Sequence, residues 1–560
     1  MNIEVVQRRL WEQSREHKRA RETAGTLFKE DPWKLRLRGL HDLMHNPVWL
    51  DEACRRTLVR SRRKASGVDK ETVHRFEQSR EHKLECLRLE LKHGTYQPQP
   101  ARRVTITEDS GKKRPLGIPC LRDKIVQEAM RMALEPVFEV EFHPSSYGFR
   151  PNRSAHHAVS RCQILMNRGF TWVIEGDVKA CFDNIAHDSI IRNLREKIMD
   201  NKFLHLVGLF LKAGVSVKGV VQPTEKGVPQ GGVLSPLLAN VVLNRLDWFL
   251  HEKGAHANRV RQTRDQGKPN VRFVRYADDW CVFITRANKQ YASTLRDQIR
   301  DFLMDTAGLT LSEEKTHITH VTDGFNFLGF RMLKGVGRRG NSVPKIKIGD
   351  KAKKNIRLRL QESLRFRPAQ ESIALRVERT SRQIRGWREY FRMAHDFPVV
   401  AAKLDYLAFW ATVKAICRKQ DISTAKCLRK HCRKTRLVFG GGLMLGRFRD
   451  ADMILRHQGP KEYVPGGEAR FEEYDDESVF SYREDRRLGA ADMRWEVMVR
   501  DSLRCRKCGT LVDYSTAHID HIIPVKRFAS FRQAHRLDNL QTLCKSCHQE
   551  KTNEERHSQR

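Results

Sequence analysis

Apolar and polar positions follow two different periods along the chain, which predicts both helices and strands. Apolar residues recur at helical spacing over residues 123–138, 237–249 and 291–304. Short apolar runs interrupted by polar residues, a pattern typical of strands, cover residues 172–177, 273–283 and 325–330. Strands with helical stretches between them predict an α+β sheet domain, which we expect to end near residue 340.

A basic helical segment and a small terminal module are predicted beyond the sheet. Residues 345–436 are dense in lysine and arginine and keep apolar residues at helical spacing. Glycines at 440–442 and an acidic run within residues 459–489 indicate a linker with some local structure. The cysteines and histidines gathered in residues 496–560 then predict a separate module.

The charge of the chain indicates a polyanionic partner. Its 560 residues include 105 lysines and arginines against 68 aspartates and glutamates, a net charge of +37, which favours nucleic acid. Hydrophobic residues make up 39% of the chain, enough for real cores, so global disorder is excluded. Without a run of 18 apolar residues or a secretory signal, we expect no membrane partner and a cytoplasmic protein, in bacterial cytoplasm or nucleoid.

Three carboxylates are the first candidates for chemistry. Asp278 and Asp279 are adjacent between apolar runs, so we expect them at a tight turn between two strands, where acids without a counterion are costly. Magnesium suits such carboxylates, and two ions can stabilise the attacking and leaving oxygens of a phosphoryl transfer. Asp177 ends another strand-like run and is the expected third ligand. An Asp-Asp pair by itself is more often a solvated hairpin turn.

The acids Asp278 and Asp279 belong to the last of five sequence motifs that follow one another along the chain. In chain order the series is SGVD (66–69), GKKRPLGIP (111–119), SYGFRP (146–151), GVPQGGVLSPLLAN (227–240) and YADD (276–279). The chain therefore resembles reverse transcriptases, and specifically group II intron-encoded reverse transcriptase/maturases, in which Tyr-Ala-Asp-Asp is the active-site turn.

The resemblance implies roles for four of these residues. Asp177 and Asp278 would bind both Mg²⁺ ions, and Asp279 would lie near the metal-bound primer end. Phe182 would be a steric gate, because an aromatic ring against C2′ of the incoming sugar excludes a ribose hydroxyl by clash. A core aromatic is the alternative for Phe182.

Other residues match the family's nucleotide contacts. Lys113 and Arg114 offer fixed cations to the triphosphate of a dNTP, with two solvated charges as the alternative. Gln230 would lie beside the nucleotide and template, at a turn whose glycines let nucleic acid approach the backbone. Ala180 is a small departure, since the family often has glycine there.

The basic helical segment resembles the maturase, or thumb, region of the same family. Arg385, Gly386 and Trp387 open the run that carries this match. The resemblance implies that the segment binds group II intron RNA, with a generic amphipathic helix pair as the alternative.

Four cysteines predict a zinc site in the terminal module. Cys505, Cys508, Cys544 and Cys547 form two Cys-x-x-Cys knuckles, a spacing at which thiolates converge tetrahedrally on one Zn²⁺. In so small a module the ion would replace a missing core, so its binding energy would be folding energy. Free core cysteines are the alternative.

Residues between and after the knuckles are similar to those of HNH endonucleases. The resemblance implies that Asp520 and His548 hold a catalytic divalent ion, with Mg²⁺ expected, and that His521 is the general base. Asn539 would orient the loop, and a structural role is favoured over a catalytic one for His518. A zinc-ribbon DNA-binding module without catalysis is the alternative for the whole site.

The predicted fold is an α+β multidomain protein with right-hand polymerase fingers and palm, an α-helical thumb and a zinc-stabilised ββα-metal HNH module. The expected parts are an N-terminal basic extension (1–60), reverse transcriptase fingers and palm (61–340), a maturase/thumb domain (341–435), a DNA-binding segment and linker (436–495) and an HNH endonuclease (496–560).

The resemblance implies an RNA-directed DNA polymerase, splicing maturase and site-specific DNA endonuclease that acts in intron mobility by target-primed reverse transcription. Its expected partners are group II intron RNA, target double-stranded DNA and dNTPs. Two alternatives stay open: a host-defence or CRISPR-linked reverse transcriptase-nuclease, and a non-mobile RNA-binding splicing maturase.

Overall fold

The computed structural model describes residues 1–23, 36–62, 65–107, 113–217, 219–254, 267–337, 342–364, 372–433, 436–439, 442–451, 460, 463–466, 497–498, 500–502, 504–512, 517–523 and 539–557. The chain divides into two compact units, Met1–Ala255 with Gln262–Glu472, and His256–Arg261 with Glu473–Arg560. Among the described residues, no helix is long and apolar enough to cross a membrane.

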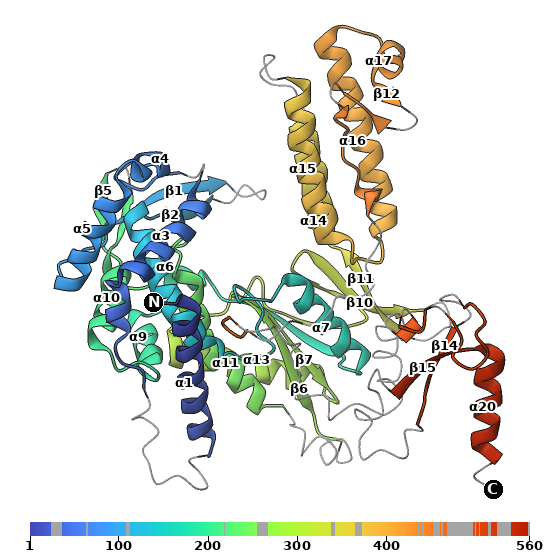
Figure 1. Cartoon of the computed structure of the whole chain (residues 1–560), viewed down its shortest axis with the longest axis horizontal. Helices are drawn as coiled ribbons and strands as arrows, with labels where there is room; N and C mark the ends of the chain where they lie inside the picture. The colour runs from blue at the N-terminus through green and yellow to red at the C-terminus, as the bar shows by residue number, and fades with distance from the viewer. Residues whose placement is uncertain are drawn as a thin grey trace. The chain divides into compact units, whose positions relative to one another are not determined.

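The first unit begins with helices that build on one long helix, α6 (Leu121–Glu139) (Figure 1). Against it pack α1 (Ile3–Thr23), α2 (Leu40–Met44) and α3 (Pro47–Ser61), while α5 (Arg80–His93) packs against α2 and α3 and contacts α4 (Val73–Glu77). Two side chains fix α1 on α6: Gln7 Nε2 donates to Met132 O and Ser14 Oγ donates to Val137 O, each over 2.8 Å. The helix predicted over residues 123–138 is confirmed by α6.

The next element is a four-stranded sheet of order β2-β1-β4-β5, and three short helices precede its strands β4 and β5 along the chain. Its strands are β1 (Ala101–Thr107), β2 (Lys113–Ile118), β4 (Val215–Val217) and β5 (Val220–Gln222), and the helices are α8 (Cys181–Asn184), α9 (His187–Arg195) and α10 (Asn201–Lys212). The Gly117 amide of β2 donates to Gln230 O over 2.7 Å, so the Gln230 turn is tied to this sheet.

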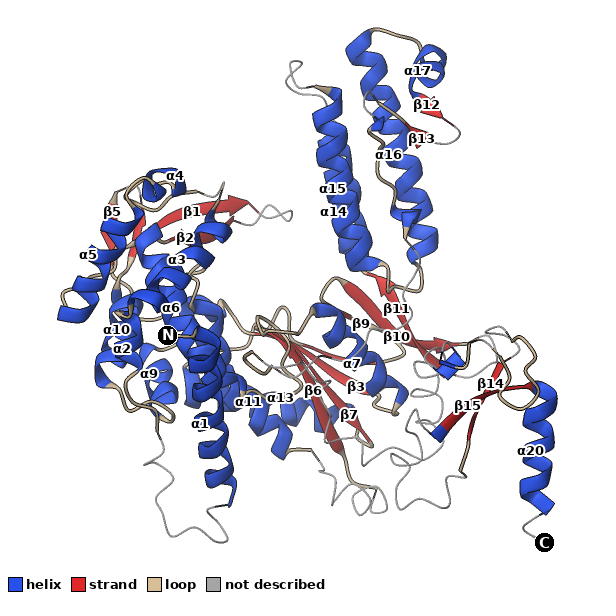
Figure 2. Cartoon of the chain, in the orientation of Figure 1, coloured by secondary structure: helices blue, strands red, loops and turns tan. Residues whose placement is uncertain are grey.

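A second four-stranded sheet, of order β6-β7-β3-β8, has helices on both faces (Figure 2). Its strands are β3 (Trp172–Asp177), β6 (Asn270–Tyr276), β7 (Asp279–Thr285) and β8 (His317–His320), and its helices are α7 (Ala155–Asn167), α11 (Ser235–Glu252) and α13 (Lys289–Ala307). Alternate side chains enter two cores, because a strand's residues point to opposite faces. Ile174 and Val282 share one core with α11 and α13, whereas Val173 and Phe283 share the other with α7. The strands predicted over residues 172–177 and 273–283 are confirmed, as are the helices over 237–249 and 291–304.

A three-stranded antiparallel sheet corrects two predictions. It consists of β9 (Phe325–Phe327), β10 (Phe330–Val336) and β11 (Ser342–Ile348). The run 325–330 is thus not one strand, because Leu328 and Gly329 both have positive φ (49° and 78°) and reverse the chain. The sheet also does not end near residue 340, nor does the helical segment begin at 345. In β11 buried Ile346 and Ile348 alternate with lysines, a strand pattern that the high charge hides.

The basic helical segment predicted beyond the sheet is confirmed. It comprises α14 (Asp350–Leu364), α15 (Ile373–Phe391), α16 (Phe397–Gln420), α17 (Thr424–His431), the short strands β12 (Cys432–Arg433) and β13 (Arg436–Leu437), and the 3₁₀ helix η3 (Phe448–Asp450). Its apolar stripes, with Leu360, Val377 and Ile384, belong to the same core as α7 and the three-stranded sheet. The segment is therefore continuous with the sheets below it.

The second unit contains a ββα arrangement. β14 (Ala517–His521) and β15 (Leu540–Cys544) form an antiparallel hairpin, and α20 (Lys545–His557) follows. The described apolar core beside it is small, with Met498, Val512 and Ala517. Most of the predicted linker and DNA-binding segment lies outside the described residues, and the predicted domain boundaries stay predictions.

Gly176 generates a stability prediction. A Cβ on this residue would lie 2.0 Å from the indole of Trp280, which is only 1% exposed. Gly176→Ala should therefore destabilise the first unit by about 1–3 kcal/mol in denaturant unfolding, because a large ring must move in a packed core.

Gly208→Ala on α10 is the matched control, since its Cβ meets nothing within 4 Å. It should be neutral or stabilising by up to about 1 kcal/mol. In a Trp280→Leu background, Gly176→Ala should cost little further stability, because the smaller side chain leaves room for the Cβ. Equal stability of Gly176→Ala and Gly208→Ala would contradict the steric argument.

Candidate functional site

Three carboxylates come together at one end of the second sheet. Asp177 ends β3 and lies directly opposite Asp279, the first residue of β7, while Asp278 lies in the tight turn between β6 and β7. Residues opposite each other on antiparallel strands have Cβ atoms about 4.5–5.5 Å apart and share one face. The structure therefore brings the three predicted acids to one end of the sheet, where the charges of Asp177 and Asp278 both act on Asp279.

A buried arginine holds this turn in place. The Arg275 guanidinium is 1% exposed and forms an ion pair with Asp247 of α11 at 2.6 Å. Its Nη1 also donates to Ala277 O (2.9 Å) and to Asn240 Oδ1 (2.8 Å). Asn240 in turn donates to Gly148 O, and a Cβ on Gly148 would lie 2.3 Å from Ala277 N. Three sequence motifs thus meet at one turn.

The sequence prediction did not identify Arg275 or Asp247. The only local signal is a charged residue inside the apolar run 273–283, and its partner lies 28 positions away.

One of the three carboxylates has a raised pKa, and another is paired with a lysine. The Asp279 side chain is open to solvent on one side, but the surrounding protein removes part of its water. This desolvation, then the charges of Asp278 and Asp177, raises the pKa of Asp279 to about 7. Lys315 Nζ lies 2.7 Å from Asp177 Oδ2, and this hydrogen bond raises the pKa of the lysine. An ammonium drawn to Asp177 and the raised pKa of Asp279 fit a site for hard divalent cations. Lys315 also escaped the sequence prediction.

The residues predicted to contact the nucleotide lie on two connected segments. Phe182 O accepts from Val228 N (2.6 Å), and Gln230 Nε2 donates to Asp183 Oδ2 (2.9 Å). The Phe182 ring is partly exposed and packs against the core of the first unit. Ala180 has φ 44°, the left-handed region that explains why glycine suits this place.

Lys113 and Arg114 lie in β2, opposite Thr107 and Ile106. Their side chains are outside what the structure describes, so their predicted contact with a triphosphate stays a prediction.

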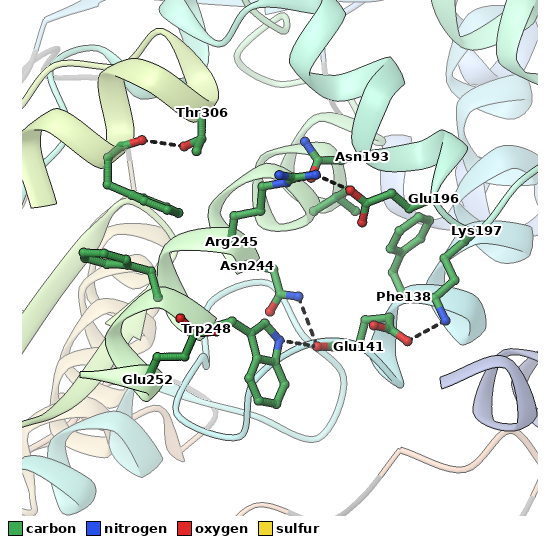
Figure 3. Close-up of a pocket in the computed structure, with 13 residues that line it drawn as sticks. Phe138, Glu141, Asn193, Glu196, Lys197, Asn244, Arg245, Trp248, Glu252 and Thr306 are labelled. Atoms are coloured by element: carbon green, nitrogen blue, oxygen red, sulfur yellow. Dashed lines mark hydrogen bonds and ion pairs between the residues drawn. The ribbon is translucent and has the colours of Figure 1, made fainter. Parts of the chain in front are cut away.

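A cavity of about 410 Å³ between α9, α11 and the end of α6 is a separate feature (Figure 3). Lys197 Nζ and Glu141 Oε1 lie 2.6 Å apart at its wall, and Arg245 pairs with Glu196. None of the predicted site residues lines this cavity. Four of its five charged side chains form these two pairs, which fits a structural role.

The predicted maturase motif lies on α15. The Trp387 ring is stacked parallel to that of Phe448, with an interplanar angle of 3° and centroids 6.4 Å apart, and so helps to hold η3. Arg385 and Gly386 are exposed, and a Cβ on Gly386 would meet nothing within 4 Å.

The four cysteines of the second unit converge. Their sulfur atoms all lie within 4.8 Å of one another, with Cys508 Sγ and Cys544 Sγ 3.7 Å apart. Cys505 and Cys508 occupy a turn closed by Gly509, whose φ is 74°, while Cys544 and Cys547 lie where β15 passes into α20. Four thiolates in this arrangement fit a tetrahedral Zn²⁺ site.

The hairpin and helix also assemble the predicted nuclease residues. The His518 ring is stacked on that of His548, with centroids 4.8 Å apart. Asp520 Oδ2 lies 2.7 Å from Lys551 Nζ, which also donates to His521 O over 2.6 Å. As in the first unit, a lysine ammonium pairs with a carboxylate that was predicted to hold a metal ion. The oxygens of Asp520 therefore suit a cation. Lys551 was not identified from the sequence.

Asn539 fixes the loop that leaves β14. Its Oδ1 accepts from Ile523 N (2.8 Å), its Nδ2 donates to Ile523 O (3.1 Å), and its own carbonyl accepts from Ile522 N (2.7 Å). Three bonds to two successive residues are what an orienting role requires.

Comparisons with known proteins identify similar sequences for both units. Residues 104–332 match the reverse transcriptase (RNA-dependent DNA polymerase) family, and residues 505–554 match the HNH endonuclease family. Protein YkfC of Escherichia coli is 42% identical over 331 residues, which cover 55% of this chain and 86% of that protein. The group II intron-encoded protein LtrA of Lactococcus lactis is 31% identical over 423 residues, 62% of this chain and 69% of that protein. A telomerase from Candida albicans, solved with a telomeric RNA fragment, aligns over 59% of this chain and 60% of its own with a TM-score of 0.32 and 14% identity.

Asp279 should make folding of the first unit pH-dependent when no divalent cation is present. Its pKa is about 7 in the folded protein against an ordinary value of 3.8, so between these values the folded state keeps a proton that the unfolded state has lost. Stability should therefore fall as the pH rises through this window. Asp279→Asn should flatten the fall in urea unfolding midpoints measured with chelator. An unchanged slope would contradict the raised pKa.

Proposed function

The chain belongs to the group II intron-encoded reverse transcriptases, and we propose that it copies its own intron RNA into DNA at a target strand cut by its HNH module. The protein is an RNA-directed DNA polymerase and an HNH endonuclease of a family that includes intron maturases. The observation that carries the proposal is the register of β3 against β7, because it places Asp177 opposite Asp279 beside Asp278 in the polymerase region.

These three carboxylates are the proposed Mg²⁺ ligands of the polymerase. When bound, magnesium supplies charge that stabilises the attacking and leaving oxygens of phosphoryl transfer. Asp177 and Asp278 would hold the ions in this proposal, and Asp279 would lie near the primer end. Lys315, whose Nζ lies 2.7 Å from Asp177 Oδ2, would leave that oxygen to an ion. The clamp of Arg275 on Ala277 O keeps the turn rigid while the charge on its acids changes.

Nucleotide selection is assigned to the segments that meet at Gln230. The exposed edge of the Phe182 ring faces the sugar in this proposal and rejects a 2′-hydroxyl by contact, while Gln230 supports the template side. Lys113 and Arg114 bind the triphosphate; their assignment rests on the sequence motif alone.

The second unit is the proposed DNA endonuclease. Asp520 and His548 hold a divalent ion, with Mg²⁺ proposed, and His521 accepts the proton of the attacking water. Asn539 fixes the loop after β14, and Zn²⁺ on the four cysteines closes the fold. His518 supports His548 through the ring stack, which favours a positioning role.

The proposed RNA partner is the group II intron itself, bound in part by the basic helical segment. The net charge of +37 supplies the cations for phosphate contacts. The alternative of a non-catalytic maturase is disfavoured by the complete set Asp177, Asp278 and Asp279. A host-defence or CRISPR-linked enzyme is disfavoured by the extent of the match to LtrA.

One preparation tests the division of labour. Asp278→Asn should abolish primer extension on an RNA template and leave nicking intact, whereas His521→Ala should abolish nicking and leave extension intact. Native intron RNA should bind both variants with wild-type affinity, since phosphate-neutralising cations elsewhere supply the affinity. Extension by Asp278→Asn at the wild-type rate would remove this assignment. Persistent nicking by His521→Ala would move the base elsewhere, with His518 the next candidate.

Gly386 provides a test of the RNA surface. A glycine inside a helix costs about 1 kcal/mol relative to alanine, and the protein itself leaves its Cβ position open. We expect RNA backbone to approach α15 there. Gly386→Ala should thus raise stability by up to about 1 kcal/mol yet weaken intron RNA binding at least about fivefold, measured by filter binding. Gly208→Ala is the control, with no expected effect on RNA affinity; an unchanged affinity for Gly386→Ala would contradict the approach.

A further inference from the structure

A cluster of metal-ligating side chains lies at α2, apart from the residues assigned above. His41 and His45 are four positions apart, one helical turn, and Asp42 lies between them. One ligand atom from each of the three lies within 4.8 Å of the others. The two imidazole rings have centroids 5.5 Å apart, and His45 Nε2 lies 3.6 Å from Asp42 Oδ1.

These separations fit ligands of one ion better than they fit a hydrogen-bonded pair. A tetrahedral ion with bonds of about 2.0–2.1 Å separates two ligand atoms by about 3.3 Å and two imidazole centroids by about 5 Å. A hydrogen bond between nitrogen and oxygen is shorter, about 2.7–3.2 Å. The observed 3.6 Å and 5.5 Å therefore need only a small inward movement to hold an ion.

The backbone of the cluster is fixed before any ion binds. His41 N donates to Asp200 Oδ2 over 2.8 Å, and Leu40 and Met44 of α2 are buried. Directly after His45, the Asn46 side chain caps α3 by accepting from Val48 N and Trp49 N. The helix also packs against α3, α5, α6 and α10. Ligands on so constrained a turn lose little freedom on binding.

We propose that His41, Asp42 and His45 bind one divalent transition-metal ion, such as zinc, cobalt or nickel, with water completing the coordination. Two imidazoles and one carboxylate favour such borderline ions over magnesium, which prefers oxygen ligands. The Asp42 side chain is 79% exposed, so the ion exchanges with solvent. This site is independent of the polymerase carboxylates and of the four cysteines.

The test uses the full chain with one equivalent of Zn²⁺ bound and Mg²⁺ in excess, so that the thiolates and the oxygen sites are filled. In a His548→Gln background, which removes the imidazole ligand of the proposed nuclease site, titration with Co²⁺ should reveal one further ion per chain whose absorption lacks thiolate charge transfer. The double variant His41→Gln with His45→Gln should weaken this binding at least tenfold. Asp42→Asn, at an exposed side chain that folding does not require, should weaken it several-fold.

His205→Gln is the matched control. His205 lines, with His41, a cavity of about 300 Å³ but is not among the three ligands, so this variant should bind Co²⁺ as the wild type does. Unchanged Co²⁺ affinity in both the double variant and Asp42→Asn would overturn the proposal. An equal loss in His205→Gln would overturn it as well, since a different group of histidines would then hold the ion. Primer extension by each variant reports on folding.

Discussion

The arrangement of the first unit depends on one buried ion pair, between Arg275 of β6 and Asp247 of α11. Removing one partner of a buried pair costs about 3–5 kcal/mol, because the other charge stays in the interior without compensation. Here the guanidinium also binds Ala277 O and Asn240 Oδ1, so a single side chain joins the sheet, the helix and the turn that carries Asp278. Through this pair, the packing of distant segments sets the geometry of the turn that carries Asp278.

The clamp also holds the turn in place beside a carboxylate, Asp279, whose pKa is raised. Asp279 resists ionisation next to Asp177 and Asp278, and Lys315 offers one compensating charge. The nuclease unit has the same arrangement on a smaller scale, where Lys551 lies against Asp520. In both units an ammonium lies against a carboxylate, which limits the electrostatic cost of gathering acidic groups.

The two units obtain their stability in different ways. The first has two extended cores on the two faces of its central sheet, so that helices α7, α11 and α13 bury most of what the strands present. The second has only a few buried apolar residues among those described, and its four converging cysteines take the place of a core. A structural metal supplies folding energy where apolar area is scarce. Packing within the protein does not explain the glycine at exposed position 386, because a Cβ there would meet nothing within 4 Å. The approach of a partner, as proposed above, would explain it.

The sequence by itself indicated the main helices and strands of the central sheet, the three acids and the two cysteine knuckles, since period, adjacency and short spacing are local properties of the chain. Strands 172–177 and 279–285 follow directly from their apolar runs, and Asp278 and Asp279 are paired simply by being neighbours. Only the tertiary structure decided what those residues face. Lys315 pairs with Asp177, which lies 138 positions away in the sequence. In β11, lysines alternate with buried isoleucines, so the high charge obscures the strand pattern. The His41 cluster has a helical spacing that the sequence does contain, but convergence of its ligand atoms depends on how the turn is held. Charge partners are chosen by packing, because electrostatic energy depends on distance in space and not on separation along the chain.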